Sequence, residues 1–193
     1  MNKALKIVLP ALMLLAGCNR PVEAPPLEGA AIGGPFVLTG EDGGRVDSRQ
    51  FDGNYRMVYF GYTFCPDVCP TDVAKLMKGY QRFAKVDATR AARVVPIFIT
   101  LDPARDTPQV LKAWTEEFDP RLIGLTGSER EIEAVAKQNA VYFKREKPNA
   151  QGAYMVDHAQ MALLFGPKGE PITLIPLDRD FETIAAELDR WVR

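Results

Sequence analysis

The sequence predicts an α/β protein with one mixed central β-sheet flanked by helices and an N-terminal β-hairpin. Two compact apolar segments, residues 57–60 and 94–101, are rich in β-forming residues and do not alternate with polar ones, which is typical of central strands buried on both faces. Segments with helical spacing follow each of them, and a hairpin and a helix close the chain. This alternation favours a mixed sheet covered by helices.

The domain opens with a predicted hairpin. Residues 36–39 and 45–47 flank Gly40-Glu41-Asp42-Gly43-Gly44, whose glycines accept the positive φ that hairpin turns require. Residues 70–85 have helical spacing and connect the two central strands. Further strands are expected at residues 122–125, 161–165 and 172–175, the last two joined by a turn at residues 166–169.

Cap residues mark the starts of three more helices. Thr107-Pro108 offers an N-cap and a proline at the first helical position, for a helix to about residue 118. Ser128 and Glu131 form a capping-box pattern that opens a helix to about residue 139. Asp180 caps a final amphipathic helix.

The first 18 residues differ from the rest of the chain. Two lysines precede an apolar run at residues 7–15, which is shorter than the about 20 residues of a membrane-spanning helix but suits a signal peptide. The segment Leu15-Ala16-Gly17-Cys18 resembles a bacterial lipobox. We therefore expect a lipoprotein-type signal peptide at residues 1–17 and lipidation of Cys18, with ordinary cleavage nearby as the alternative.

Residues 18–34 are rich in proline and glycine and show no periodicity, so they are interpreted as a lipid anchor and flexible tether for a domain at residues 35–193. The expected location is the bacterial cell envelope, with the domain on the periplasmic side of the membrane. Lysine plus arginine (24) nearly balances aspartate plus glutamate (25), with no basic stripe, which argues against nucleic acid as a partner. A monomer is expected because no long apolar patch is evident.

Cys65 and Cys69 carry the strongest chemical signal. They directly follow a predicted strand and come at or just before a helix expected to begin at Pro70, where free amides and the helix dipole stabilise thiolates. Both thiols are therefore expected to ionise more readily than a free cysteine. Their spacing lets them share a metal or form a disulfide. A purely structural disulfide is the weaker interpretation, because so short a loop constrains the unfolded chain little.

A third metal ligand is expected because two thiolates do not fill most coordination shells. His158 is the only histidine of the chain and lies just before the strand expected from residue 161. Two soft thiolates and one imidazole suit copper, as Cu(I) or Cu(II), with zinc as the alternative metal. A solvated or structurally satisfied histidine is the other interpretation of His158.

Four neighbours of these residues have two interpretations each. Asp67 and Asp157 adjoin proposed ligands and either orient them or are solvated loop acids. Tyr62 and Phe64 either shield the site from water or belong to the core.

These residues together resemble the Sco/SenC family of copper-binding cytochrome c oxidase assembly proteins. The likeness covers roughly residues 35 to 192, and four segments carry it in order: Val58-Tyr59-Phe60-Gly61-Tyr62-Thr63-Phe64-Cys65-Pro66-Asp67-Val68-Cys69-Pro70, Thr100-Leu101-Asp102-Pro103-Ala104-Arg105-Asp106-Thr107-Pro108, Gly124-Leu125-Thr126-Gly127 and Val156-Asp157-His158. Residues 102–108 have no chemistry that their spacing reveals, so they are not assigned to the site.

The resemblance implies a thioredoxin-like fold and copper bound by Cys65, Cys69 and His158. It also implies that the partner is cytochrome c oxidase subunit II or its assembly factors, with copper delivered to the dinuclear site of that subunit. The family is further associated with reduction of the oxidase cysteines, for which Cys65 and Cys69 would be the redox pair. The alternative function is therefore a thiol-disulfide oxidoreductase of the cell envelope. However, three residues separate the cysteines here, where thioredoxin-type redox pairs have two.

Overall fold

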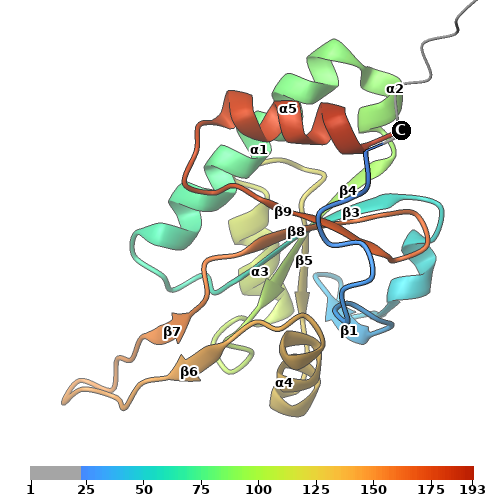
Figure 1. Cartoon of the computed structure of the whole chain (residues 1–193). Coiled ribbons are helices and arrows are strands. Elements are labelled where there is room, and N and C mark those ends of the chain that lie inside the picture. Colours follow the sequence, from blue (N-terminus) through green and yellow to red (C-terminus); the bar gives the residue numbers. More distant parts are fainter. Residues whose placement is uncertain (1–22) are drawn as a thin grey trace, which may run out of the picture.

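The computed structural model describes residues 23–193 (Figure 1). Its strands are β1 (Val37–Gly40), β2 (Arg45–Asp47), β3 (Tyr55–Gly61), β4 (Val94–Thr100), β5 (Ile123–Thr126), β6 (Phe143–Arg145), β7 (Val156–His158), β8 (Ala162–Phe165) and β9 (Pro171–Ile175). Its helices are α1 (Val68–Val86), α2 (Ala88–Ala91), α3 (Pro108–Thr115), α4 (Glu129–Gln138) and α5 (Phe181–Trp191), with a 3-10 turn η1 (Ser48–Phe51).

Seven strands form one mixed sheet in the order β2-β1-β5-β4-β3-β8-β9. Strands β3, β4 and β5 run parallel, and the outer strands are antiparallel to their neighbours. All of β3 is buried, as expected of the predicted central strand. The hairpins predicted at the two ends of the domain are confirmed as β1–β2 and β8–β9.

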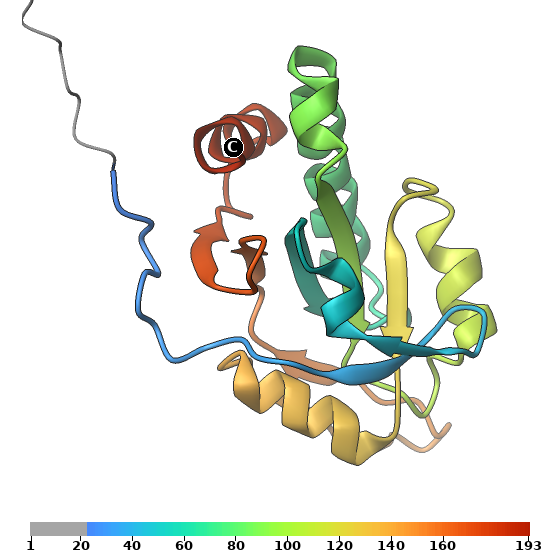
Figure 2. The same cartoon turned by 90° about the vertical axis from the view of Figure 1, so that its right-hand side faces the viewer.

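Helices cover both faces of this sheet (Figure 2). One face carries α1, α3 and α5. There, the ring of Phe98 in β4 lies 4.6 Å from that of Trp114 in α3, and Gly79 of α1 leaves room for α5. The next residue of β4, Ile99, points to the opposite face, where it lines a small cavity with Asn139 at the end of α4. The predicted architecture of a mixed sheet flanked by helices is confirmed.

The predicted caps form as expected. Thr107 and Asp180 each accept a hydrogen bond from the amide three residues later, at 3.3 Å and 2.8 Å. The capping box of α4 is complete: Ser128 accepts from the Glu131 amide at 3.3 Å, and the Glu131 carboxylate accepts from the Ser128 amide at 2.7 Å. Each bond satisfies an amide that has no partner within its helix.

Helix α1 begins at Val68, two residues before the predicted start at Pro70. The hydroxyl of Thr71 donates to the carbonyl of Asp67 at 2.8 Å within this first turn. Proline is accepted there because an amide in the first turn has no intrahelical partner. Cys69 therefore belongs to the first turn of α1 and does not precede it.

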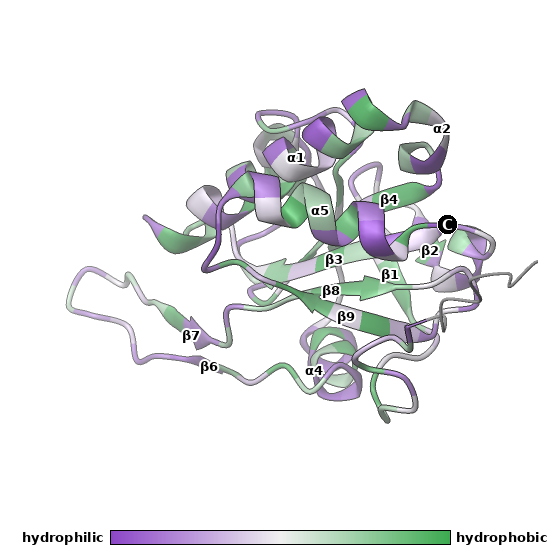
Figure 3. Cartoon of the chain, turned by 45° about the horizontal axis from the view of Figure 1, so that its top comes forward, coloured by the Kyte–Doolittle hydropathy of each residue, from purple (hydrophilic) through white to green (hydrophobic). Residues whose placement is uncertain are grey.

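The hairpin of β6 and β7 is absent from the sequence-based prediction. It forms a separate two-stranded sheet, in which Phe143 pairs with His158, and it projects beyond the main sheet (Figures 1 and 3). His158 therefore ends a strand of its own, whereas the sequence placed it only just before the strand expected from residue 161. Each strand has only three residues, too few to show an alternating pattern.

Residues 23–34, within the predicted tether, run along the domain. The amide of Leu27 donates to the carbonyl of Ile172 at 3.0 Å, and the amide of Gly33 donates to that of Gln138 at 2.9 Å. The placement of the domain boundary at residue 34 stays a prediction.

The predicted signal peptide, residues 1–17, and the lipidation of Cys18 lie outside the described residues and also stay predictions. Within residues 23–193, none of the helices has the length and apolar character needed to cross a membrane.

Candidate metal centre

Three segments meet at the edge of the sheet where β3 and β4 end. Residues 62–67 lead from β3 into α1, residues 101–107 lead from β4 into α3, and residues 159–161 lead from β7 into the antiparallel β8. Parallel strands end at the same edge of a sheet, so loops that are distant in the sequence come together there. All three candidate ligands belong to these segments or to the elements they join.

Gly61, the last residue of β3, allows α1 to approach the sheet closely. A Cβ at this position would lie 2.7 Å from the Tyr59 ring and 3.1 Å from the sulfur of Cys69. Cys69 is fully buried, whereas Cys65 in the preceding loop is partly exposed. The amide of Cys69 donates to Cys65 Sγ at 3.4 Å. The two residues are free thiols side by side.

The two thiols differ in acidity. Burial opposes the ionisation of Cys65, but amide hydrogen bonds from Cys69, Asp67 and Val68 outweigh it and lower the pKa of this thiol. Burial raises the pKa of Cys69 to about 12. The expectation that both thiols ionise readily is therefore confirmed for Cys65 and wrong for Cys69. The cause is the complete burial of Cys69, which faces Gly61 of β3 from the first turn of α1.

His158 faces Cys69 from the end of β7. Its Nε2 lies 3.5 Å from Cys69 Sγ, and its Nδ1 lies 3.0 Å from the carbonyl oxygen of Ala159. A carbonyl only accepts hydrogen bonds, so Nδ1 carries the proton and Nε2 presents its lone pair to Cys69. A histidine that donates one nitrogen to a backbone carbonyl and offers the other is the usual arrangement of a metal ligand.

The donor set fits a soft metal ion. Thiolates and imidazole together suit copper. A metal bound to both Cys69 and His158 keeps the donor atoms about 3–4 Å apart, which matches the 3.5 Å between them. Among residues 23–193, no three His, Cys, Asp or Glu side chains already form a metal-binding group. The three-ligand assignment stays a prediction.

Comparison with known proteins identifies the family of this chain. A family model described as SCO1/SenC matches residues 24–193. The chain belongs to the SCO1/SenC family. The resemblance seen in the sequence is thereby confirmed, and the fold is thioredoxin-like, as in the solved Sco structures.

Two curated SCO1/SenC relatives are mitochondrial: SCO1 homolog 1 of Arabidopsis thaliana is 37% identical over 172 residues, and the human SCO1 homolog is 34% identical over 162 residues. These matches cover 89% and 84% of this chain but 50% and 53% of the relatives, so the chain spans about half their length. Among solved structures, ScoI of Bradyrhizobium japonicum with copper bound is 38% identical, with a TM-score of 0.75. That match covers 83% of this chain and 99% of ScoI.

The neighbours predicted from the sequence have different surroundings. Tyr62 is buried and its ring meets the His158 ring edge-on at 5.9 Å, so it shields one side of the site. Phe64 is 52% exposed. Asp157 is exposed and, as the strand neighbour of His158, points to the opposite face of the hairpin. The side chain of Asp67 caps no amide of α1. Neither aspartate side chain contacts a candidate ligand, and Asp67 acts on Cys65 only through its amide.

Asp72 is a buried residue of the site that sequence reasoning missed. It lies one turn along α1 from Cys69, is 6% exposed, and accepts a hydrogen bond from Tyr59 Oη at 3.3 Å. Burial raises the pKa of this carboxyl. Its position three residues after Cys69, on the same helical face, was the available signal.

Asp106 is a second missed residue, and it belongs to the segment 102–108 that was not assigned to the site. It is fully buried and accepts hydrogen bonds from Thr63 N at 3.0 Å, Thr63 Oγ1 at 2.6 Å and Thr100 Oγ1 at 2.6 Å. It therefore anchors the loop that carries Cys65 to the end of β4. The available sequence signal was an aspartate only a few residues after a predicted buried strand, where a carboxylate can bond to the strand end.

Proposed function

We propose that this protein binds copper through Cys65, Cys69 and His158 and delivers it to the dinuclear copper site of cytochrome c oxidase subunit II. The observation that carries the proposal is the 3.5 Å approach of Cys69 Sγ and His158 Nε2, from positions 89 residues apart. Membership of the SCO1/SenC family and the copper bound by the related ScoI support it.

The unequal thiols suit the uptake and release of copper as cargo. Cys65 is partly exposed and has a lowered pKa, so its thiolate is available to an incoming ion. Cys69 is buried with a raised pKa, so binding at this sulfur releases its proton. Copper held by one buried and one accessible sulfur can be approached by ligands of a partner from the exposed side.

The proposed location follows from the leader. A lipid on Cys18 would hold the protein at a membrane of the bacterial cell envelope, with residues 35–193 on the periplasmic side. A monomer on its anchor would present the exposed side of the site to the oxidase.

Copper loading of the purified protein tests the ligand set. We expect one copper per chain with a thiolate-to-Cu(II) absorption band, and we expect His158→Ala to weaken binding and change that band. Asp157→Ala is the matched control, because this neighbour is exposed and points away from the site. Equal copper affinity in His158→Ala and the unaltered protein would contradict the three-ligand site. Failure of the loaded protein to pass copper to the soluble domain of subunit II would contradict delivery.

A thiol-disulfide oxidoreductase is the second candidate function. The observation in its favour is the lowered pKa of Cys65 beside the thiol of Cys69, since a low-pKa thiol attacks disulfides readily. This function requires both cysteines but not His158. Two results would favour the oxidoreductase. The His158→Ala variant would reduce a disulfide in a subunit II peptide, and the unaltered protein would bind no stoichiometric copper.

A further inference from the structure

We propose that Asp102 and Arg105 are positioning residues of the copper site, which clamp the β6–β7 hairpin, and with it His158, against the loop that carries Cys65. The inference rests on the proposed copper-binding function. Neither residue touches a candidate ligand, so each would act through the segments that it holds.

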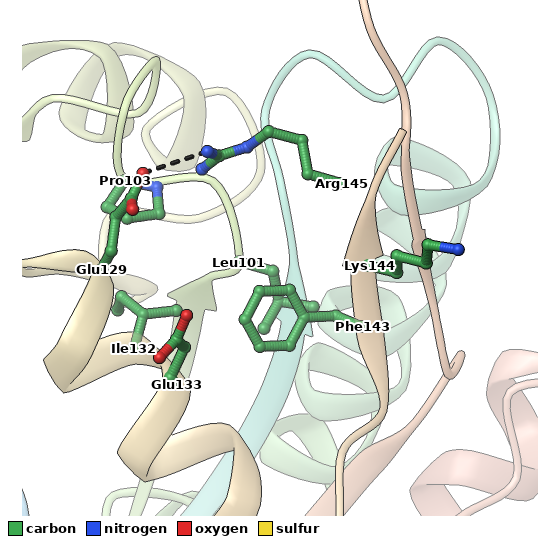
Figure 4. A pocket seen from close by; sticks show the side chains of 8 residues that line it. All are labelled: Leu101, Pro103, Glu129, Ile132, Glu133, Phe143, Lys144 and Arg145. Carbon is green, nitrogen blue, oxygen red and sulfur yellow. Dashed lines mark hydrogen bonds and ion pairs between the residues drawn. The ribbon is translucent and has the colours of Figure 1, made fainter. Parts of the chain in front are cut away.

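The hairpin is joined to the domain by side chains and not by strand pairing: Val156 is buried in the core, and Arg145 pairs with Glu129 of α4 at 3.0 Å. β6 and β7 form their own two-stranded sheet and share no strand pairing with the main one. Between β6 and α4 lies a cavity of about 250 Å³, with Leu101, Ile132 and Phe143 among its lining residues (Figure 4). Phe143 is the residue paired with His158 across the hairpin. Apolar packing is therefore incomplete beside the strand position that supports the histidine.

Asp102 fastens both strands of the hairpin. Its side chain is fully buried and accepts hydrogen bonds from Tyr154 Oη at 2.9 Å, from Arg145 Nη2 at 3.5 Å and from Arg105 Nε. Arg145 is the last residue of β6, and Tyr154 lies just before β7. One carboxylate after β4 thus binds both sides of the hairpin.

Arg105 links the hairpin to the cysteine loop. Its guanidinium carbon lies 3.8 Å from the ring centroid of Tyr154, 4.8 Å from that of Phe64 and 5.7 Å from that of Tyr62. Nη1 donates to the Tyr154 carbonyl at 3.1 Å. Nη2 is buried and has no hydrogen-bond partner, so the surrounding rings are its main contacts. Tyr62 in turn contacts the His158 ring.

The clamp holds His158 in place before copper binds, so that less conformational entropy is lost on binding. If the hairpin is docked only a fraction of the time, the apparent copper affinity falls by that fraction. Replacement of Arg105 by lysine keeps the charge but loses the planar stacking and the forked hydrogen bonds. We therefore expect Arg105→Lys to weaken copper binding about tenfold, which corresponds to a hairpin docked about a tenth of the time.

A double-mutant cycle tests the inference. Cu(I) affinity is measured by competition with bathocuproine disulfonate for Arg105→Lys and for the milder Tyr154→Phe, each with His158 present and with His158→Ala. Because the clamp acts through His158, both substitutions should weaken binding only when the histidine is present. An equal loss in the His158→Ala background would overturn the inference.

Arg121→Lys is the matched control. Arg121 pairs with Asp119 at 3.1 Å, and its guanidinium carbon lies 4.5 Å from the ring centroid of Tyr80, so its surroundings are like those of Arg105. Tyr80 lies eleven residues along α1 from Cys69, far from the site. Arg121→Lys should leave copper affinity unchanged. A loss equal to that of Arg105→Lys would mean general loosening and would overturn the inference.

A measurement without copper separates this inference from the proposed function. The amide of Ala159 donates to the Tyr142 carbonyl at 2.9 Å across the hairpin. A two-stranded hairpin is marginally stable on its own, so a hairpin that leaves the domain should open, and the hydrogen exchange of this amide reports undocking. In the metal-free protein, Arg105→Lys should accelerate this exchange by at least about tenfold, because the undocked fraction rises to about nine tenths, and leave core amides of α1 unchanged. Unaltered exchange would overturn the clamp even if copper binds. Absence of copper binding by the unaltered protein would instead overturn the proposed function.

Discussion

Cys65 and Cys69 belong to one motif but occupy different environments. Cys65 lies in a loop and receives amide hydrogen bonds, whereas Cys69 lies against Tyr59 and Gly61 in the core. Amide donors favour the thiolate, and removal from water disfavours it. The sequence pattern predicts two thiols near a helix N-terminus. It does not reveal which thiol is buried in the core and which is partly exposed.

Alkylation with iodoacetamide, followed by site-resolved mass spectrometry, tests this difference. The pKa of Cys65 is lowered, so between the folded and unfolded pKa values its thiolate is present only in the folded protein. In that pH window Cys65 should react faster in the folded protein than in urea. Cys69, with a pKa of about 12 and no exposure, should react more slowly in the folded protein than in urea. Equal reactivity of the two folded thiols would contradict the assignment.

The ligand candidates could be named from residue chemistry alone, because thiolates and imidazole are the side chains that bind soft metal ions and the chain has one histidine. Asp72, Asp102 and Asp106 could not. Their chemistry depends on burial and on partners up to 52 positions away, such as Tyr154 for Asp102. A carboxylate in a sequence does not reveal whether it meets water or the core.

At the scale of elements, the sequence predicted those helix starts and strands that depend on neighbouring residues, and missed the elements that depend on distant contacts. The caps at Thr107, Ser128 and Asp180 mark helix starts because they act on amides within three residues. The β6–β7 hairpin has no such local signal: its strands are short and are held by contacts with the loop after β4. The start of α1 was also displaced, because Pro70 is compatible with more than one position in a first turn.

The close approach of β3 and α1 at Gly61 predicts that a larger residue there would push the helix away from the sheet. In Gly61→Ala, the new Cβ would meet Tyr59 at 2.7 Å and Cys69 Sγ at 3.1 Å, so α1 must shift outward. Urea denaturation should show a loss of about 1–3 kcal/mol in the free energy of unfolding, and alkylation of Cys69 should become faster.

The control for this change is Gly44→Ala. There the new Cβ would come within 3.1 Å of the Asp42 side chain, which lies in an exposed turn and can move away. It should alter stability by much less than Gly61→Ala. Similar stability and similar Cys69 reactivity in the two variants would show that α1 does not depend on the glycine.

At the scale of the whole molecule, the site is an assembly of segments that only the sheet brings together. Contacts join Thr63 to Asp106, Tyr154 to Asp102 and Cys69 to His158, over 43, 52 and 89 positions. The parallel pairing of β3 with β4 and the antiparallel pairing of β3 with β8 place all three junctions at one edge. The fold class was predictable from alternating strands and helices, whereas these junctions depend on strand order, which no local pattern specifies.

Because copper would join segments that are separate in the unfolded chain, binding should stabilise the whole fold. Copper at about 100 times its Kd adds about 2.7 kcal/mol to the free energy of unfolding. For a domain of this size that raises Tm by about 5–11 °C. Thermal unfolding of the Cu(I)-loaded protein should show this rise, reduced by whatever copper the unfolded thiols retain, and a Cu(I) chelator should reverse it. The double variant Cys65→Ser/Cys69→Ser should show no shift, and an equal shift in that variant would place copper elsewhere on the protein.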